Sequence, residues 1–96
     1  TKSLAQELGP HRIAVNAIAP GGITTPGTAV TYPVALGQPA PEVPEPVTGD
    51  DFLRRILMGR MGAPDEIATV VLFLVSRAAS YMTGSLVVVD GGYLAG

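Results

Sequence analysis

The first eight residues carry the pattern of a short amphipathic helix. Leu4 and Leu8 lie four positions apart, so both fall on one helical face. Gly9 followed by Pro10 is a stop signal, because glycine favours the C-terminal cap and proline cannot continue the helical hydrogen bonds. We therefore predict a helix over residues 1–8.

Two runs of apolar, mostly β-branched residues, 13–19 and 86–89, predict strands. Glycine-containing turn signals at 20–22 and at 90–92 end the two runs. Nearly continuous apolar runs of this length are typical of strands that are buried on both faces in parallel sheets. Both runs therefore predict strands of the type that a complete parallel sheet buries on both faces.

Two helices are predicted between these strands. The first covers residues 50–58, with Asp50 as its N-cap and Gly59 at its end. The second covers residues 64–76, because Pro64 suits the first turn and the carboxylates after it suit the helix dipole. This second helix is apolar on nearly all sides and needs cover on more than one face. The order strand, helix, strand predicts a parallel pair with a right-handed crossover.

The fold class that these elements predict is α/β. Two strands that are buried on both faces cannot complete a sheet by themselves. The chain of 96 residues is therefore expected to be the end of a larger α/β domain.

Residues 27–49 break the regular pattern. Five of the nine prolines of the chain lie there, and no helical or strand period survives that density. A long loop is predicted. Loops of this length are lids, binding loops or disordered inserts, and the sequence leaves these alternatives open.

Composition and charge exclude several classes of function. Six Lys and Arg against eight Asp and Glu give a net charge of −2, which argues against nucleic-acid binding. The absence of cysteine and the single histidine, His11, argue against a metal site, and His11 is expected in a solvated turn. No secretory signal is visible, and the longest apolar run, 70–75, is far below the about 20 residues that span a bilayer. We therefore expect a cytoplasmic protein without a membrane partner.

No self-sufficient catalytic site is visible in the sequence. Glycine-rich phosphate motifs are missing, the serines have no triad context, and helix starts explain the paired carboxylates. The informative stretch is 16–26, which places backbone amides and the Thr25 hydroxyl just beyond the carboxyl end of a predicted strand. Open α/β sheets bind ligands at that edge. An ordinary strand-ending turn is the alternative for this stretch.

Four segments in order resemble the C-terminal part of the short-chain dehydrogenase/reductases. They are the helix end at 1–8, the strand and Pro-Gly motif at 12–21, the helix start at 59–68 and the closing strand at 81–92. Members of this family are Rossmann-fold enzymes that depend on NAD or NADP. The resemblance implies that residues 1–96 are the C-terminal βαβ part of one Rossmann-type, doubly wound parallel sheet.

The resemblance also implies a set of cofactor-binding residues. Pro20, Gly21, Ile23 and Thr25 match the Pro-Gly-x-Ile-x-Thr pattern of the family. The backbone of Ile23 would hydrogen-bond the nicotinamide carboxamide, and Thr25 would contact that amide or the nearby phosphate. Residues 27–49 would correspond to the substrate loop.

The catalytic residues of the family have no counterpart in this chain. The glycine-rich fingerprint, the active-site serine and the Tyr-x-x-x-Lys pair are expected before Thr1, and Lys2 is the only lysine. The resemblance thus implies a fragment, inactive alone, of an oxidoreductase that interconverts a small-molecule alcohol and a carbonyl by hydride transfer and forms a homo-oligomer, dimer or tetramer. The alternative is a small non-catalytic interaction or dimerisation module derived from that family. The sequence does not separate NAD from NADP or identify the substrate.

Overall fold

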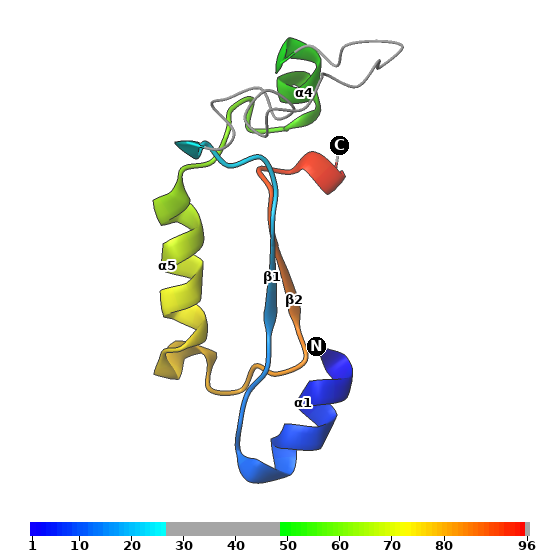
Figure 1. Ribbon diagram of the computed structural model, residues 1–96, viewed down its shortest axis with the longest axis vertical. Coiled ribbons are helices and arrows are strands. Elements are labelled where there is room, and N and C mark those ends of the chain that lie inside the picture. Colours follow the sequence, from blue (N-terminus) through cyan, green and yellow to red (C-terminus); the bar gives the residue numbers. More distant parts are fainter. Residues whose placement is uncertain (27–48, 96) are drawn as a thin grey trace, which may run out of the picture. The chain divides into compact units, whose positions relative to one another are not determined.

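A computed structural model describes residues 1–26 and 49–95 of the chain (Figure 1). The chain divides into two compact units, which are treated separately: the first is Thr1–Gly21 with Asp65–Val89, and the second is Gly22–Pro64 with Asp90–Gly96. The elements in chain order are α1 (Lys2–Leu8), η1 (Gly9–His11), β1 (Ala17–Pro20), α4 (Gly49–Arg55), α5 (Pro64–Leu74), η2 (Arg77–Ala79), β2 (Leu86–Val89) and η3 (Tyr93–Ala95), where η marks a 3-10 turn.

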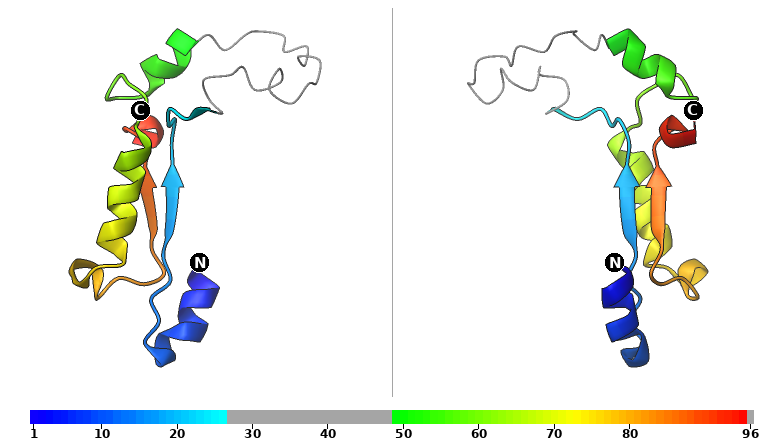
Figure 2. Two further views of the ribbon diagram at one scale, coloured as in Figure 1. Left: turned by 60° about the vertical axis from the view of Figure 1, so that its left-hand side comes forward. Right: turned by 90° about the vertical axis from the view of Figure 1, so that its right-hand side faces the viewer.

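A parallel pair of strands organises the first unit. Ala17 pairs with Leu86 at one end of the ladder, and Pro20 pairs with Val89 at the other. Helix α5 lies in the connection from β1 to β2 and runs alongside the two strands (Figures 1 and 2). The predicted α/β class and the predicted order of strand, helix and strand are confirmed.

Strand β1 is shorter than the predicted strand over 13–19 and begins at Ala17. Val15, which precedes β1, forms hydrogen bonds with the residues that precede β2. Its amide donates to the Thr83 hydroxyl at 3.0 Å, and its carbonyl accepts from the Gly84 amide at 2.7 Å. A side-chain acceptor therefore takes the place of one regular rung of the ladder. Regular pairing starts only where β2 begins at Leu86.

The Asn16 side chain links the segment before β1 to the segment before β2 by hydrogen bonds. Its Nδ2 donates to the Met82 carbonyl at 3.1 Å, and its Oδ1 accepts from the Ser85 amide at 3.1 Å. Both hydrogen bonds are partly buried and connect residues more than sixty positions apart in the sequence. Asn16 thus fixes the register at the amino end of the parallel pair.

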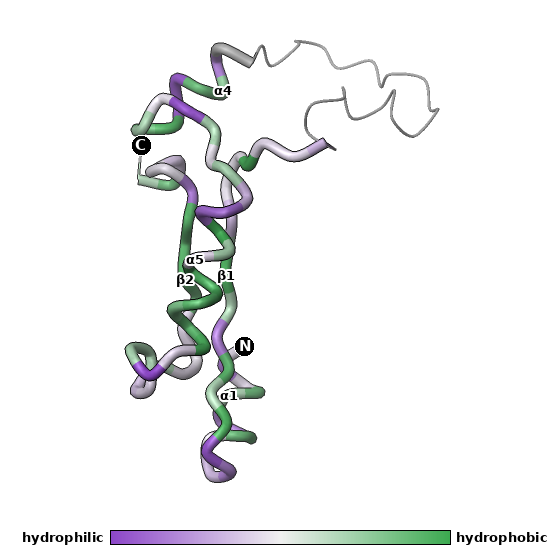
Figure 3. The backbone as a smooth tube through the Cα atoms, turned by 90° about the vertical axis from the view of Figure 1, so that its left-hand side faces the viewer, coloured by the Kyte–Doolittle hydropathy of each residue, from purple (hydrophilic) through white to green (hydrophobic). Residues whose placement is uncertain are grey.

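The burial predicted for the strands is not reached within this chain. Leu86 and Val88 are 63% and 44% exposed, and the buried hydrophobic residues among those described are Ala5, Ile56 and Ala79. Figure 3 shows that α5, β1 and β2 are nevertheless largely hydrophobic. One helix and two strands leave much of one another's surface uncovered, which agrees with the expectation that the chain is the end of a larger α/β domain.

The first helix ends at Leu8 with Gly9 as its C-cap, as predicted. Gly9 has φ −53°, and the chain continues into η1 with Pro10 in its first turn, where proline needs no backbone donor. The reversal comes later, at Arg12, whose φ of +60° lies in the left-handed region. His11 is exposed, as predicted.

Helix α4 begins at Gly49, so Asp50 lies within the helix and the prediction that Asp50 is its N-cap is wrong. The helix ends at Arg55, before the predicted end at 58, and Gly59 with φ +69° lies in the turn that follows. The proline-rich segment 27–49 lies outside the described residues except for Gly49.

Helix α5 begins at Pro64 as predicted, with Asp65 and Glu66 in its first turn. It ends at Leu74, two residues earlier than predicted, because Ser76 already caps η2 by accepting a hydrogen bond from the Ala78 amide. Within the described residues, no helix is long and apolar enough to cross a membrane.

Phe52 of α4 packs directly on Gly22 in the second unit. A Cβ atom added at Gly22 would lie 2.7 Å from Phe52 Cε1 and 2.9 Å from Met61 Sδ. Real Cβ contacts are longer than this, so no other residue fits at position 22 without moving the ring or the thioether. Close packing therefore favours glycine here, because a larger residue has to displace the Phe52 ring and the Met61 thioether.

Asn16→Ala is expected to destabilise the first unit by about 1–3 kcal/mol, because two partly buried backbone groups lose their partners. Urea unfolding followed by circular dichroism measures the change. Gln6→Ala removes an exposed amide from α1 and is the matched control, with an expected change within about 0.5 kcal/mol. Equal stability of the two variants would contradict the role of Asn16.

Gly22→Ala is expected to cost about 1–3 kcal/mol, because the new methyl group overlaps Phe52 and Met61. Gly9→Ala is the control: nothing lies within 4 Å of a Cβ at that position, and its φ suits alanine. Urea unfolding followed by tyrosine fluorescence compares the two. The packing described for Gly22 is wrong if its variant is as stable as the Gly9 variant.

Candidate cofactor-binding site

The four predicted cofactor residues follow one another along the chain from the end of β1. Pro20 is the last residue of β1, and the Gly21 amide donates to the Val89 carbonyl at 2.9 Å, which extends the ladder by one hydrogen bond. These two residues belong to the first unit. Ile23 and Thr25 belong to the second unit.

The backbone around Ile23 is fixed by pairing with Gly62. The two residues form an isolated parallel bridge. The Gly62 amide donates to the Gly22 carbonyl, and the Thr24 amide donates to the Gly62 carbonyl, each at 2.9 Å. Two hydrogen bonds to a single residue therefore define the path of the chain on both sides of Ile23.

Thr25 is half-buried, whereas Thr24 is exposed. A threonine hydroxyl both donates and accepts hydrogen bonds, and a backbone residue offers one donor and one acceptor. A primary carboxamide likewise presents an NH₂ donor and a carbonyl acceptor. The chemistry of Ile23 and Thr25 therefore matches the nicotinamide carboxamide that was predicted as their ligand.

A turn over residues 90–94, here called the C-terminal turn, belongs to the same unit as Ile23 and Thr25. Asp90 Oδ1 accepts from the Gly92 amide at 2.8 Å, and Oδ2 accepts from the Leu94 amide at 2.9 Å. The hydrogen bonds from Leu94 and then Gly92 hold the pKa of Asp90 below its ordinary value. Their stabilising contribution is therefore present at neutral pH and is lost as the pH falls through the lowered pKa.

Helix α4 contacts the C-terminal turn through aromatic side chains. The rings of Phe52 and Tyr93 have centroids 5.5 Å apart and are tilted by 37°. The Arg55 guanidinium carbon lies 5.2 Å from the centre of the Tyr93 ring, within the range of a cation–π contact. Tyr93 therefore interacts with two residues of α4, spaced three positions apart.

Sequence reasoning missed Gly62 and Asp90 as parts of this unit. Gly62 lies in a segment that was identified only as a helix start, and its role depends on pairing with residues about forty positions away. Asp90 carried a usable local signal, since aspartate before two glycines is typical of a turn in which the carboxylate binds nearby amides.

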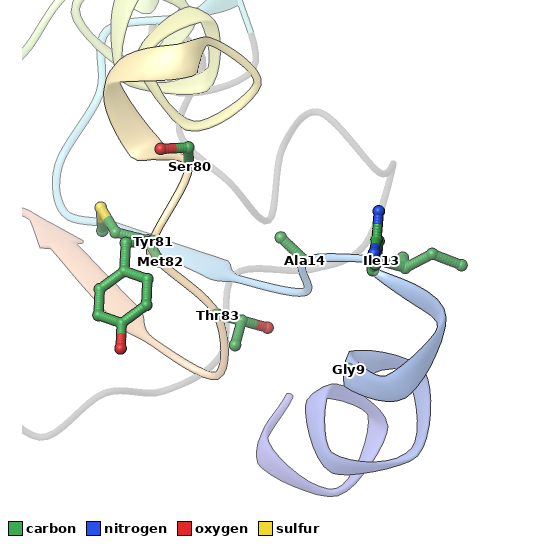
Figure 4. A pocket seen from close by; sticks show the side chains of 8 residues that line it. Gly9, Ile13, Ala14, Ser80, Tyr81, Met82 and Thr83 are labelled. Carbon is green, nitrogen blue, oxygen red and sulfur yellow. The ribbon is translucent and has the colours of Figure 1, made fainter.

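A separate pocket of about 510 Å³ belongs to the first unit (Figure 4). It is lined by residues that precede β1 and β2, namely Gly9, Arg12, Ile13, Ala14, Ser80, Tyr81, Met82 and Thr83. Open α/β sheets bind ligands at the carboxyl ends of the strands, and this pocket lies at the amino ends. None of the predicted cofactor residues lines it.

Comparison with known proteins gives the family of the chain. The family profile described as enoyl-(acyl carrier protein) reductase matches residues 1–94. The 3-oxoacyl-(acyl-carrier-protein) reductase FabG of Aquifex aeolicus is 45% identical over 92 residues, 96% of this chain and 32% of the relative. A 3α-hydroxysteroid dehydrogenase of Mediterraneibacter gnavus is 43% identical over 91 residues, 95% of this chain and 31% of the relative. The chain thus spans about a third of the length of these curated relatives.

Solved structures give the same result. A candidate 2-deoxy-D-gluconate 3-dehydrogenase from Agrobacterium tumefaciens, crystallised with NADP, matches with a TM-score of 0.77 and 39% identity over all of this chain and 35% of its own. The TT0495 protein of Thermus thermophilus matches with a TM-score of 0.76 and 35% identity, over all of this chain and 36% of its own. These similarities confirm the resemblance that the four sequence segments predicted. The chain belongs to the short-chain dehydrogenase/reductase family.

Proposed function

We propose that this chain is the C-terminal part of an NAD(P)-dependent oxidoreductase that interconverts an alcohol and a carbonyl by hydride transfer. The observation that carries the proposal is the family match over residues 1–94, which includes the whole segment from Pro20 to Thr25. The relatives described above include a reductase and a dehydrogenase, and both names describe the same redox pair. One structural relative holds NADP.

The chain by itself is proposed to be inactive. It spans about a third of its relatives, and no tyrosine is followed four positions later by lysine in its sequence. Lys2 is the only lysine and has no tyrosine before it. The general acid/base of the family would therefore come from a longer protein that carries this chain.

The residues after β1 are proposed to hold the nicotinamide end of the cofactor. The main chain of Ile23 and the Thr25 hydroxyl would bind the carboxamide, and the pairing of Gly22 and Thr24 with Gly62 would keep both groups in place. Pro20 and Gly21 would end the strand beside the cofactor, where the missing side chain of glycine allows close approach. When bound, the cofactor supplies or accepts the hydride. The contribution of this chain is orientation of the ring.

The proposed substrate is a small molecule with a ketone or secondary alcohol. Relatives are named for a 3-oxoacyl group and for a 3α-hydroxysteroid, so the class of reacting group is shared while the rest of the molecule differs. The net charge of −2 supports the absence of a nucleic-acid partner. The longer protein that carries this chain is proposed to be cytoplasmic and to form a homo-oligomer, either a dimer or a tetramer.

A second candidate function is a non-catalytic interaction module derived from the same family. Exposed apolar side chains favour it: Leu72 of α5, Val75 just after that helix and Leu86 of β2 are 65%, 77% and 63% exposed. Surface of this kind is usually covered by protein. The two candidates differ in whether a longer protein that carries the chain has catalytic activity.

Turnover assays separate the two candidates. The longer protein that carries this chain and the 96-residue chain are assayed side by side, with NADH and NADPH, on a set of small ketones. The proposed function predicts cofactor oxidation by the longer protein and none by the chain alone. Turnover by the chain alone would contradict its proposed inactivity, and absence of turnover by the longer protein with both cofactors would favour the interaction module.

In the longer protein, Thr25→Val is expected to raise the KM for the cofactor by roughly tenfold, the scale of one lost hydrogen bond of about 0.5–1.5 kcal/mol. Thr69→Val removes an exposed hydroxyl on α5 and is the matched control, with an expected KM close to that of the wild type. Steady-state kinetics with NAD(H) and NADP(H) measure both variants. Unchanged KM values for both cofactors would rule out the role of Thr25.

A further inference from the structure

We infer that Asp90 is a positioning residue for the segment 22–25: by ordering the C-terminal turn, it holds α4 against Gly22 and so sets the backbone around Ile23. All the contacts that support this inference lie within the second unit. The inference rests on the proposed function only for the identity of the group that the segment holds.

The Asp90 carboxylate defines the C-terminal turn by using both of its oxygens. One oxygen accepts from the Gly92 amide, and the other accepts from the Leu94 amide within η3. An asparagine at position 90 offers only one acceptor oxygen and places an NH₂ group opposite the remaining amide. The turn therefore requires a carboxylate for both hydrogen bonds.

The C-terminal turn packs closely on the residues that follow α4. The Met58 amide donates to the Gly91 carbonyl at 3.0 Å. A Cβ atom at Gly91 would lie 2.8 Å from Ile56 Cγ2, and one at Gly92 would lie 2.8 Å from Leu57 Cβ. Both glycines have positive φ, +62° and +90°, which few other residues adopt. Glycine at both positions therefore lets the turn that the carboxylate stabilises pack closely on residues 56–58.

Tyr93 extends this contact to α4 itself. Its ring packs against Phe52 and under the Arg55 guanidinium. Phe52 in turn fills the space beside Gly22 that a side chain would otherwise take. A single ring therefore touches both the C-terminal turn and the segment proposed to bind the cofactor.

The series of contacts ends at the hydrogen bonds that fix Ile23. The Gly22 carbonyl accepts from the Gly62 amide, and the Gly62 carbonyl accepts from the Thr24 amide. A shift of Phe52 away from Gly22 releases the close packing on one side of this pairing. Asp90 acts on this pairing through Tyr93, whose ring contacts Phe52, and through Phe52, which packs beside Gly22.

Amide hydrogen exchange tests the inference on the full 96-residue chain and on the longer protein that carries it. Asp90→Asn is compared with Asp65→Asn, which makes the same change at an exposed carboxylate in the first turn of α5. The Asp90 variant is expected to exchange about five- to tenfold faster at the amides of Gly62 and Thr24, as well as at Gly92 and Leu94. The Asp65 variant is expected to match the wild type at all four.

Faster exchange confined to Gly92 and Leu94 would overturn the inference, because Asp90 would then order only its own turn. If Asp90→Asn also speeds exchange of the Ala17 amide, which lies in the sheet of the first unit, the variant has unfolded as a whole. In that case the Tyr93→Leu variant tests the inference instead. That variant keeps the carboxylate but removes the ring. Tyr93→Leu is expected to speed exchange at Gly62 and Thr24 by a similar factor and to leave Gly92 protected. Exchange at Gly62 and Thr24 as slow as in the wild type would overturn the inference.

Cofactor kinetics of the longer protein give the second readout. Asp90→Asn is expected to raise the KM for the cofactor three- to tenfold with kcat reduced by less than about twofold, the pattern of lost ground-state binding. Faster exchange at Thr24 with an unchanged KM would overturn the positioning role. If the wild-type protein binds neither NAD(H) nor NADP(H), the proposed function fails, while the exchange result still decides whether Asp90 orders the segment.

Discussion

The parallel pairing of β1 with β2 is the interaction on which the rest of this chain depends. Parallel strands cannot be joined by a tight turn, so the sequence between them must cross over, and α5 lies in that connection. Both strands end on one pair of residues, Pro20 and Val89. The segments that follow the two strands along the chain, 22–25 and 90–94, both belong to the second unit.

The same pairing explains why so much apolar surface is exposed. A two-stranded parallel sheet has an open edge on each strand and two faces to cover. The described residues supply one long helix, and the hydrophobic residues they bury are small except for Ile56. The sequences of β1, β2 and α5 are nevertheless as apolar as those of strands and helices that are covered on more than one side. This mismatch is what a piece of a larger sheet exhibits, and it is consistent with a match to about a third of each relative.

The regular elements could be predicted from the sequence to within a few residues, because apolar period and helix-start signals act locally. Pro64 marks the true start of α5. Local signals were misleading where distant contacts decide. The first strand starts at Ala17 rather than at residue 13, and the residue before it, Asn16, accepts from the Ser85 amide through its side chain.

The candidate site was predicted in part. Residues 20–25 were singled out by their place after a strand and by the family pattern, and their role toward the cofactor stays a prediction. The partners that fix this segment were not predicted. Gly62 acts through its backbone and Phe52 through the packing of its ring against Gly22, and local sequence patterns do not show which distant residues these two contact. Asp90 is the exception, since its Asp-Gly-Gly context is a local turn signal.

The central claim is that this chain functions as the C-terminal third of an oxidoreductase, and the intact mass of the natural protein tests it most directly. An antibody against residues 50–62 isolates the protein from its source, and mass spectrometry gives the mass. The account predicts a species of roughly three times the 9.8 kDa of this chain, the size of a single Rossmann-type domain. A species of 9.8 kDa alone would contradict it and would reduce the family membership to shared ancestry.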